Sequence, residues 1–242
     1  MQRALTLTKT TIGKKVLMAA SGTVILGFAV GHLAGNLKIF AGAQEFNEYA
    51  AFLRSLPALL WGTRIALLVA FSVHIASAFS LWQRNRHARK SRYARKASLA
   101  SDYASRTMYW TGPILAFYVL FHLVHLTLGG VIFPDNQVLF IEGYVFDPHN
   151  PFNNMVYGFQ HPLVVVPYVL GVVALGMHLF HGIWSLFQSL GANHPRYNDL
   201  RRDLSVGLSA LITVGFLIIP IAVLAGLVEP TTETFHFPEL EP

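Results

Sequence analysis

The chain contains no cysteine and carries little charge. Among its 242 residues 12% are charged and 53% are hydrophobic, whereas a soluble domain carries roughly a quarter charged residues. The absence of cysteine excludes disulfides, thiolate metal sites and iron–sulfur clusters built from this chain alone. The shortage of charge, together with long uncharged runs, predicts an all-α integral membrane protein.

Five apolar runs are long enough to cross a bilayer as helices, which takes about 20 residues. The predicted spans are residues 16–37, 58–82, 109–133, 162–190 and 204–228. Basic residues before the first run are also typical of a secretory signal. That run is too long for a signal, however, and His32 and Asn36 stand where a cleavage region would be. We therefore expect a single membrane domain with five transmembrane helices.

Basic residues gather on one side of the predicted spans. Residues 1–15 hold four Lys and Arg, residues 83–107 hold eight and residues 191–203 hold three, so fifteen of the eighteen share one side. The positive-inside rule then places the N-terminus in the cytoplasm and the C-terminus outside. A net charge of +6 can also indicate nucleic-acid binding, but basic residues beside apolar spans suit a membrane surface. We expect the lipid bilayer as a partner and no nucleic acid.

Histidines recur inside four of the five spans. They are His32, His74, His122 with His125, and His178 with His181. Because an ionisable side chain in hydrocarbon is costly, each of them marks a candidate functional site. At a rise of about 1.5 Å per residue, His32 and His122 lie about 26 and 22 Å from the cytoplasmic end. His74 and His178 lie about 14 and 16 Å from the same end.

The two depths predict two histidine pairs, each able to hold one haem iron from both faces. Two axial imidazoles leave no position for oxygen, which suits electron transfer. We therefore expect the first four helices to form a bundle around two haems stacked along the membrane normal. Depth does not choose between His122 and His125, nor between His178 and His181. For any single histidine the alternative role is a hydrogen bond between helices.

Several spaced motifs, covering nearly the whole chain, carry a family resemblance. They are Gly-His-Leu-Ala-Gly-Asn-Leu at 31–37, Glu-Phe-Asn-Glu-Tyr through Ser-Leu-Pro at 45–57, His74, Arg-Thr at 106–107, Thr-Gly at 111–112 before His122, and His178 with Gly-Ile-Trp-Ser at 182–185. In this order they resemble the five-helix, dihaem cytochrome b subunit of bacterial succinate dehydrogenases and fumarate reductases.

The resemblance implies which histidines hold the two b haems. The family spacing selects His122, ten residues after Gly112, and His178, four residues before Gly182. It implies that His32 and His122 bind the haem far from the cytoplasm, and that His74 and His178 bind the near one. Candidates for contacts with haem propionates or with the ligands are His125, His181 and Arg64. For Arg64 the alternative is a side chain that reaches the headgroups.

The resemblance also implies the partners. A flavoprotein subunit would oxidise succinate, and an iron–sulfur subunit would dock on the cytoplasmic face of the bacterial inner membrane. This chain would anchor both and pass electrons to a quinone, usually menaquinone, without touching the dicarboxylate. Polar residues predicted to contact quinone are Ser21, Asn36, Lys38, Glu45, Glu48, Arg106 and His161. The alternative for each of these is solvation at the membrane interface.

Two other classes of protein remain open. One is the cytochrome b subunit of a membrane hydrogenase or formate dehydrogenase, which is also a histidine-rich helix bundle. The other is a carrier or plain anchor without haem. The Ser-Leu-Pro and Gly-Ile-Trp-Ser contexts favour the succinate family over the first. No predicted span contains Asp or Glu, so the intramembrane carboxylate that some family members use for proton movement is not expected.

The charge asymmetry makes a topology prediction. A reporter that is active only in the cytoplasm should be active when fused within residues 83–107 and inactive when fused after Glu229. A reporter that is active only outside should give the reverse pattern. Cytoplasmic activity of the fusion after Glu229 would contradict a five-span topology.

Overall fold

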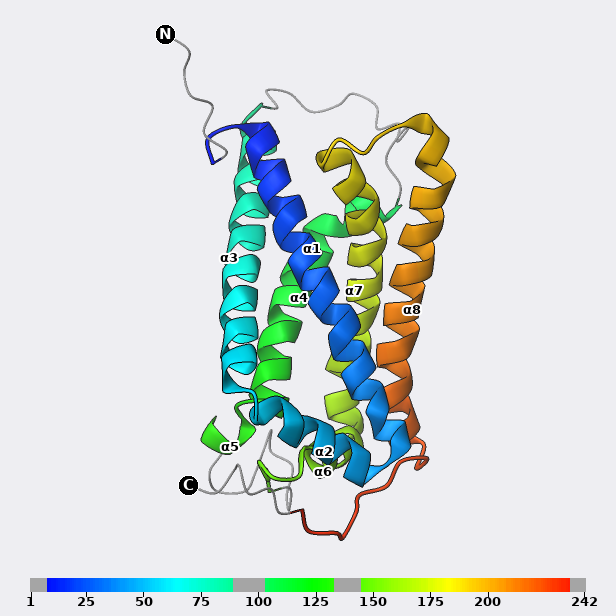
Figure 1. Ribbon diagram of the computed structural model, residues 1–242. Coiled ribbons are helices and arrows are strands. Elements are labelled where there is room, and N and C mark those ends of the chain that lie inside the picture. Colours follow the sequence, from blue (N-terminus) through cyan, green and yellow to red (C-terminus); the bar gives the residue numbers. More distant parts are fainter. Residues whose placement is uncertain (1–7, 89–102, 133–144, 236–242) are drawn as a thin grey trace.

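The computed structural model describes residues 8–88, 103–132 and 145–235 (Figure 1). Five of its helices are long and apolar enough to cross a membrane, which confirms that prediction. They are α1 (Thr11–Asn36), α3 (Pro57–Ala88), α4 (Tyr103–Leu126), α7 (Pro162–Ser189) and α8 (Asn198–Leu224). The shorter elements are η1 (Leu37–Ala41), α2 (Ala43–Arg54), α5 (Gly129–Ile132), α6 (Pro151–Phe159) and η3 (Pro195–Tyr197). Residues 1–7 and 89–102, which belong to the basic segments, lie outside the described residues, as do residues 133–144 and 236–242.

The five long helices run antiparallel to one another in chain order (Figure 1). α1 packs against α3, α7 and α8, and α7 also packs against α4 and α8. The first four long helices therefore form a bundle in which α1 lies diagonally opposite α4, and α3 opposite α7. We call the end where α1, α4 and α8 begin the basic end, and the end covered by α2 and α6 the capped end. Described residues from all three predicted cytoplasmic segments share the basic end.

Four of the five helices differ from the predicted spans by several residues. α1 begins earlier, at Thr11, and α3 continues to Ala88. α4 ends at Leu126 instead of continuing to residue 133, because the Leu128 N–H donates to the Leu123 carbonyl (2.8 Å) and closes the helix before α5 begins. α8 ends at Leu224, where Gly226 takes a positive φ of 72° and the Leu227 N–H bonds to the Ala222 carbonyl (2.9 Å). Both helices also begin before the predicted spans, since the apolar run omits their polar first turns.

The hydrophobic core cluster of the described residues lies at the capped end. α2 buries Phe46, Asn47 and Ala51. Most residues of α6 are buried as well. The apolar core here comprises Ile39, Phe46, Phe152, Met155, Val156, Phe159, Val164, Val165, Tyr168, Ile219, Ala222, Val223 and Val228. Along the spans, in contrast, large side chains such as Phe117 (74% exposed) and Leu163 (88%) face outward, as lipid-facing positions do.

Asparagine side chains tie the capped end together. Asn47 is fully buried, its Nδ2 donates to Asn150 Oδ1 (3.0 Å), and its Oδ1 accepts from the Phe152 N–H (2.9 Å). Asn153 makes two bonds with the backbone of Thr231, donating from Nδ2 (2.8 Å) and accepting at Oδ1 (2.9 Å). α2, α6 and the segment after α8 are therefore joined by buried polar contacts rather than by packing alone.

At the basic end, α1 is tied to the last turns of α3. Lys14 Nζ donates to Ser80 Oγ, and Arg84 donates to the Lys9 carbonyl (2.8 Å). The Thr10 side chain caps α1 by accepting from the Gly13 N–H (3.0 Å). These contacts help to fix the position of α1 along α3, and therefore the relative depths of His32 and His74.

The substitution Asn47→Ala should destabilise the capped end. It leaves the buried Phe152 N–H without its acceptor, at a cost of about 1–3 kcal/mol. We expect a lower midpoint of thermal unfolding for the detergent-solubilised protein, followed by circular dichroism. Gln44→Ala is the matched control, because Gln44 is exposed on the same helix and donates to Glu48 (2.8 Å). Equal midpoints for the two variants would contradict this role of Asn47.

Candidate functional site

The structure brings four intramembrane histidines together in two pairs, and these are the pairs that the family resemblance selects among those that depth allows. The rings of His32 on α1 and His122 on α4 have centroids 5.8 Å apart, with an interplanar angle of 82°. The rings of His74 on α3 and His178 on α7 have centroids 6.2 Å apart, with an angle of 56°. Each pair joins diagonally opposite helices, so the rings meet inside the four-helix bundle.

These distances fit a metal ion held between two imidazoles. Two imidazoles on opposite sides of one ion, each at a metal–nitrogen distance of about 2 Å, have ring centroids about 6 Å apart. All four rings are half-buried. The described residues contain no group of three or more His, Asp or Glu side chains suited to one metal ion. The arrangement is therefore one of histidine pairs, as an axially ligated haem requires.

His74 is held in the tautomer that a metal ligand needs. Its Nδ1 lies 3.1 Å from the Met18 carbonyl and 3.3 Å from Ser21 Oγ, both on α1. A carbonyl only accepts, and the Ser21 hydroxyl proton is donated to the Leu17 carbonyl (2.7 Å). Nδ1 must therefore carry the hydrogen, which leaves the lone pair of Nε2 for a metal.

His178 has an equivalent partner on the facing helix. Its Nδ1 lies 3.3 Å from Oγ1 of Thr111 on α4, a side chain that is 1% exposed. The Thr111 oxygen can accept a hydrogen from Nδ1 of His178, and Nε2 is then left as the metal-binding nitrogen. In both rings of this pair, a neighbouring helix supplies the group that orients the imidazole.

His32 is surrounded mainly by its own helix and by aromatic rings. Phe28 stacks on it with centroids 5.1 Å apart, and Phe216 of α8 lies at 5.9 Å. Asn36 donates to the His32 carbonyl (2.7 Å), and its Nδ2 lies 3.3 Å from His32 Nδ1. Asn36, a predicted quinone residue, therefore sits against a histidine of the pair.

His125 is placed differently from the four paired histidines. It is fully buried, and its Nδ1 lies 2.9 Å from the Tyr168 hydroxyl oxygen. Its ring packs on Phe121 and Phe159 and faces the backbone of Gly158, where a Cβ would collide with it. His125 is thus oriented toward α6 and the capped end. His181 is half-buried on α7, one turn beyond His178 toward the basic end.

The glycines of α1 divide into two kinds. A Cβ added to Gly35 would meet the Tyr49 ring at 2.7 Å, so this glycine allows α2 to approach closely. A Cβ at Gly27 or Gly31 would meet nothing within 4 Å. Those two glycines therefore do not serve helix packing within the described chain. They leave a flat backbone strip on the helix that carries His32, as a planar cofactor would require.

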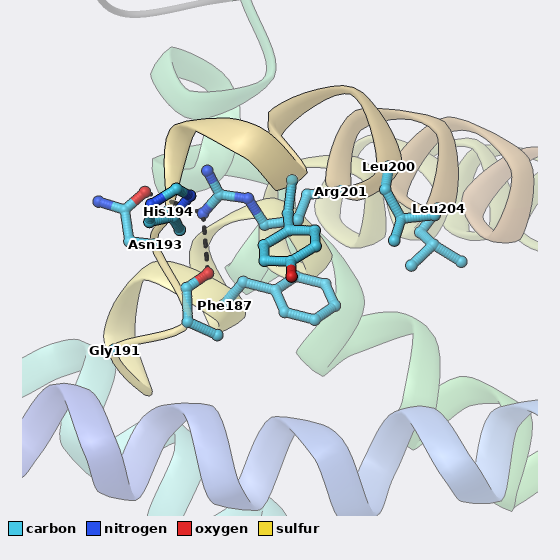
Figure 2. A pocket seen from close by; sticks show the side chains of 9 residues that line it. Phe187, Gly191, Asn193, His194, Leu200, Arg201 and Leu204 are labelled. Atoms are coloured by element: carbon cyan, nitrogen blue, oxygen red, sulfur yellow. Dashed lines mark hydrogen bonds between the residues drawn. The ribbon is translucent and has the colours of Figure 1, made fainter.

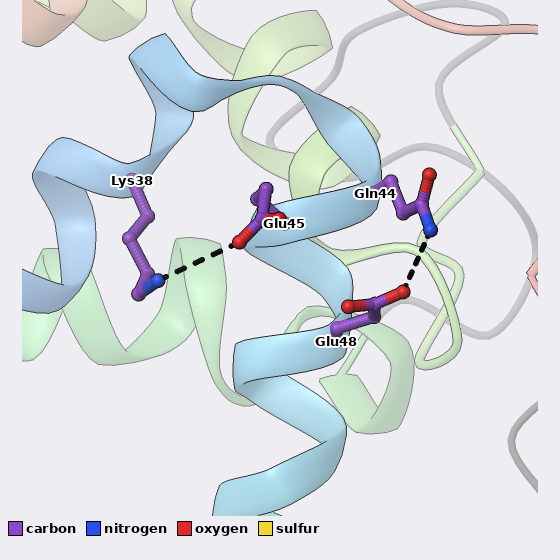
Figure 3. Close-up of polar contacts among 4 residues, drawn as sticks. All are labelled: Lys38, Gln44, Glu45 and Glu48. Carbon is purple, nitrogen blue, oxygen red and sulfur yellow. Dashed lines mark hydrogen bonds and ion pairs between the residues drawn. The ribbon is translucent and has the colours of Figure 1, made fainter.

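Few of the other predicted site residues come together. Lys38 and Glu45 form an ion pair (3.8 Å) between η1 and α2, with both side chains exposed (Figure 3). Arg64 is exposed and lies over the Trp61 ring (4.9 Å). His161 is exposed at the start of α7. Ser21 lies beside His74.

A pocket of about 430 Å³ opens where α7 turns into α8 (Figure 2). Arg201, only 3% exposed, crosses it and donates to the Ala192 carbonyl (3.2 Å) and to Asn193 Oδ1 (2.9 Å). The guanidinium also lies over Trp184 of the Gly-Ile-Trp-Ser motif (4.8 Å). The guanidinium of Arg201 thus holds the connection between α7 and α8 in place. The pocket lies apart from the histidine pairs.

Sequence reasoning did not single out the groups that orient the histidines. These are Met18, Thr111 and Tyr168. Two of them could have been recognised in the sequence, because Thr111 belongs to the Thr-Gly motif and Tyr168 carries a hydroxyl inside an apolar span. The Met18 carbonyl could not, because only the packing of the helices makes a backbone group a partner of a side chain.

Comparison of the chain with protein-family models, with curated protein sequences and with solved structures gave no match.

Proposed function

We propose that this chain is the haem-binding membrane subunit of a succinate:quinone oxidoreductase. The observation that carries the proposal is the geometry of the two histidine pairs. Their ring centroids are 5.8 and 6.2 Å apart, and in the second pair both Nδ1 atoms face acceptors that leave Nε2 for iron.

The proposal assigns the axial positions to His32 and His122 in one site, and to His74 and His178 in the other. Bound b haem would supply one-electron transfer at each site, without an open position for oxygen. The chain contributes the ligands, the groups that orient them and a low-dielectric bundle that excludes water. Gly27 and Gly31 keep the backbone beside His32 bare.

The two sites differ in depth, and this supports a transmembrane electron path. His74 and His178 lie nearer the basic end, where an iron–sulfur subunit would dock on an exposed positive surface. His32 and His122 lie nearer the capped end. Of the residues predicted to contact quinone at that end, Asn36 contacts His32, and the others are Lys38, Glu45, Glu48 and His161.

The choice of succinate rests on the sequence motifs, and a purification tests it. We expect the tagged chain to purify with a flavoprotein and an iron–sulfur protein, to give two haems per chain in a pyridine haemochrome assay, and to reduce a menaquinone analogue with succinate. One haem or none would contradict the paired-histidine assignment. Two haems with hydrogenase or formate dehydrogenase activity in place of succinate oxidation would assign the chain to the other class.

Single substitutions test the ligand assignment. His122→Ala and His178→Ala should each remove one low-spin haem signal from the visible and EPR spectra, because the iron keeps only one imidazole. The loss of bound haem should also weaken assembly, since a ligand stabilises the state that binds it.

His125→Ala and His181→Ala are the matched controls, three residues away on the same helices. They should keep two low-spin haems and change only the potential or the affinity. Loss of a haem signal in His125→Ala but not in His122→Ala would reverse the assignment on α4. The comparison of His181 with His178 decides α7 in the same way.

A further inference from the structure

The hydroxyl of Tyr168 lies between two histidines of α4. Its oxygen is 3.3 Å from His122 Nδ1 and 2.9 Å from His125 Nδ1. Tyr168 is on α7 and only 4% exposed, and its ring packs edge-on against both imidazoles with centroids 5.9 and 5.6 Å away. Phe159 of the cap also packs on it at 4.7 Å. The hydroxyl is therefore held in place from α4, α6 and α7.

One hydroxyl proton cannot be donated to both histidines, and a Tyr168 hydroxyl that donates to one of them can accept from the other in two arrangements. In the first, His122 Nδ1–H donates to the Tyr168 oxygen, and the Tyr168 O–H donates to His125 Nδ1. In the second, both bonds run the other way, and His122 carries its hydrogen on Nε2. Only the first arrangement leaves Nε2 of His122 with a lone pair for a metal.

We propose that Tyr168 is a positioning residue that fixes the tautomer of His122, and that His125 directs the Tyr168 hydroxyl. This inference rests on the proposed function, since it concerns the iron that His32 and His122 would hold. It assigns Tyr168 and His125 a role in setting the midpoint potential of the haem held by His32 and His122, and no role at the site of His74 and His178. At the second site, the corresponding groups are the Met18 carbonyl and the Thr111 hydroxyl.

The expected effect has a definite sign. An imidazole that donates its second N–H is a more basic ligand, and a more basic ligand favours ferric over ferrous iron. Removal of the acceptor should therefore raise the midpoint potential of the haem held by His122. The haem held by His74 and His178 should not respond, because neither histidine contacts Tyr168 in the described structure.

The test is Tyr168→Phe in the intact complex, with redox titration followed by visible and EPR spectra. We expect two haems per chain, with a raised midpoint potential and altered low-spin g values for one of them. Tyr118→Phe is the control, since the Tyr118 ring contacts His122 with centroids 6.2 Å apart but no hydroxyl bond to it is seen. Thr111→Val should shift only the other haem.

Each outcome decides the inference. Unchanged potentials in Tyr168→Phe, or equal shifts of both haems, would overturn it while leaving the proposed function intact. A wild-type complex without haem would overturn the proposed function and this inference together. If Tyr168→Phe does not assemble, His125→Ala takes its place: it must shift the potential of the same haem, and an unchanged potential would overturn the inference.

Discussion

Both nitrogens of an imidazole that is half-buried in a hydrocarbon environment need a polar partner, and the arrangement of the long helices depends on this requirement. Each ring presents two polar atoms that lipid cannot satisfy. In His74, His122 and His178, Nδ1 meets an oxygen atom of a different helix. The paired rings lie with centroids 5.8 and 6.2 Å apart. The histidines thus fix how the long helices are rotated and how far they are shifted along one another.

The two ends of the molecule serve this arrangement in different ways. At the capped end, buried asparagines and a compact apolar core hold α2, α6 and α7 together, and Tyr168 belongs to that core. A change in the cap would therefore reach His122 through α6 and Tyr168. At the basic end, short polar contacts from Lys14 and Arg84 hold α1 to α3, and Arg201 closes the turn between α7 and α8.

The two histidine pairs are chemically unequal. One is oriented by a backbone carbonyl and aliphatic hydroxyls, whereas the other is oriented by a phenol linked to a third histidine. Different acceptors on the ligands are a known means of giving two metal sites different potentials. A chain that moves electrons in one direction across a membrane benefits from such a difference. In the proposed function, the surroundings of the ligands therefore matter as much as the ligands themselves.

The sequence alone determined the five apolar helices, the end that the basic segments share and the two depths at which histidines lie, because these follow from hydropathy, length and helical rise. The tertiary structure decided the rest. Depth cannot separate His122 from His125, because both share one face of α4; only the rotation of α4 against α6 and α7 points one toward His32 and the other toward Gly158. Ser21 and Asn36 likewise became partners of histidines, since a side chain's contacts depend on which helices lie beside it.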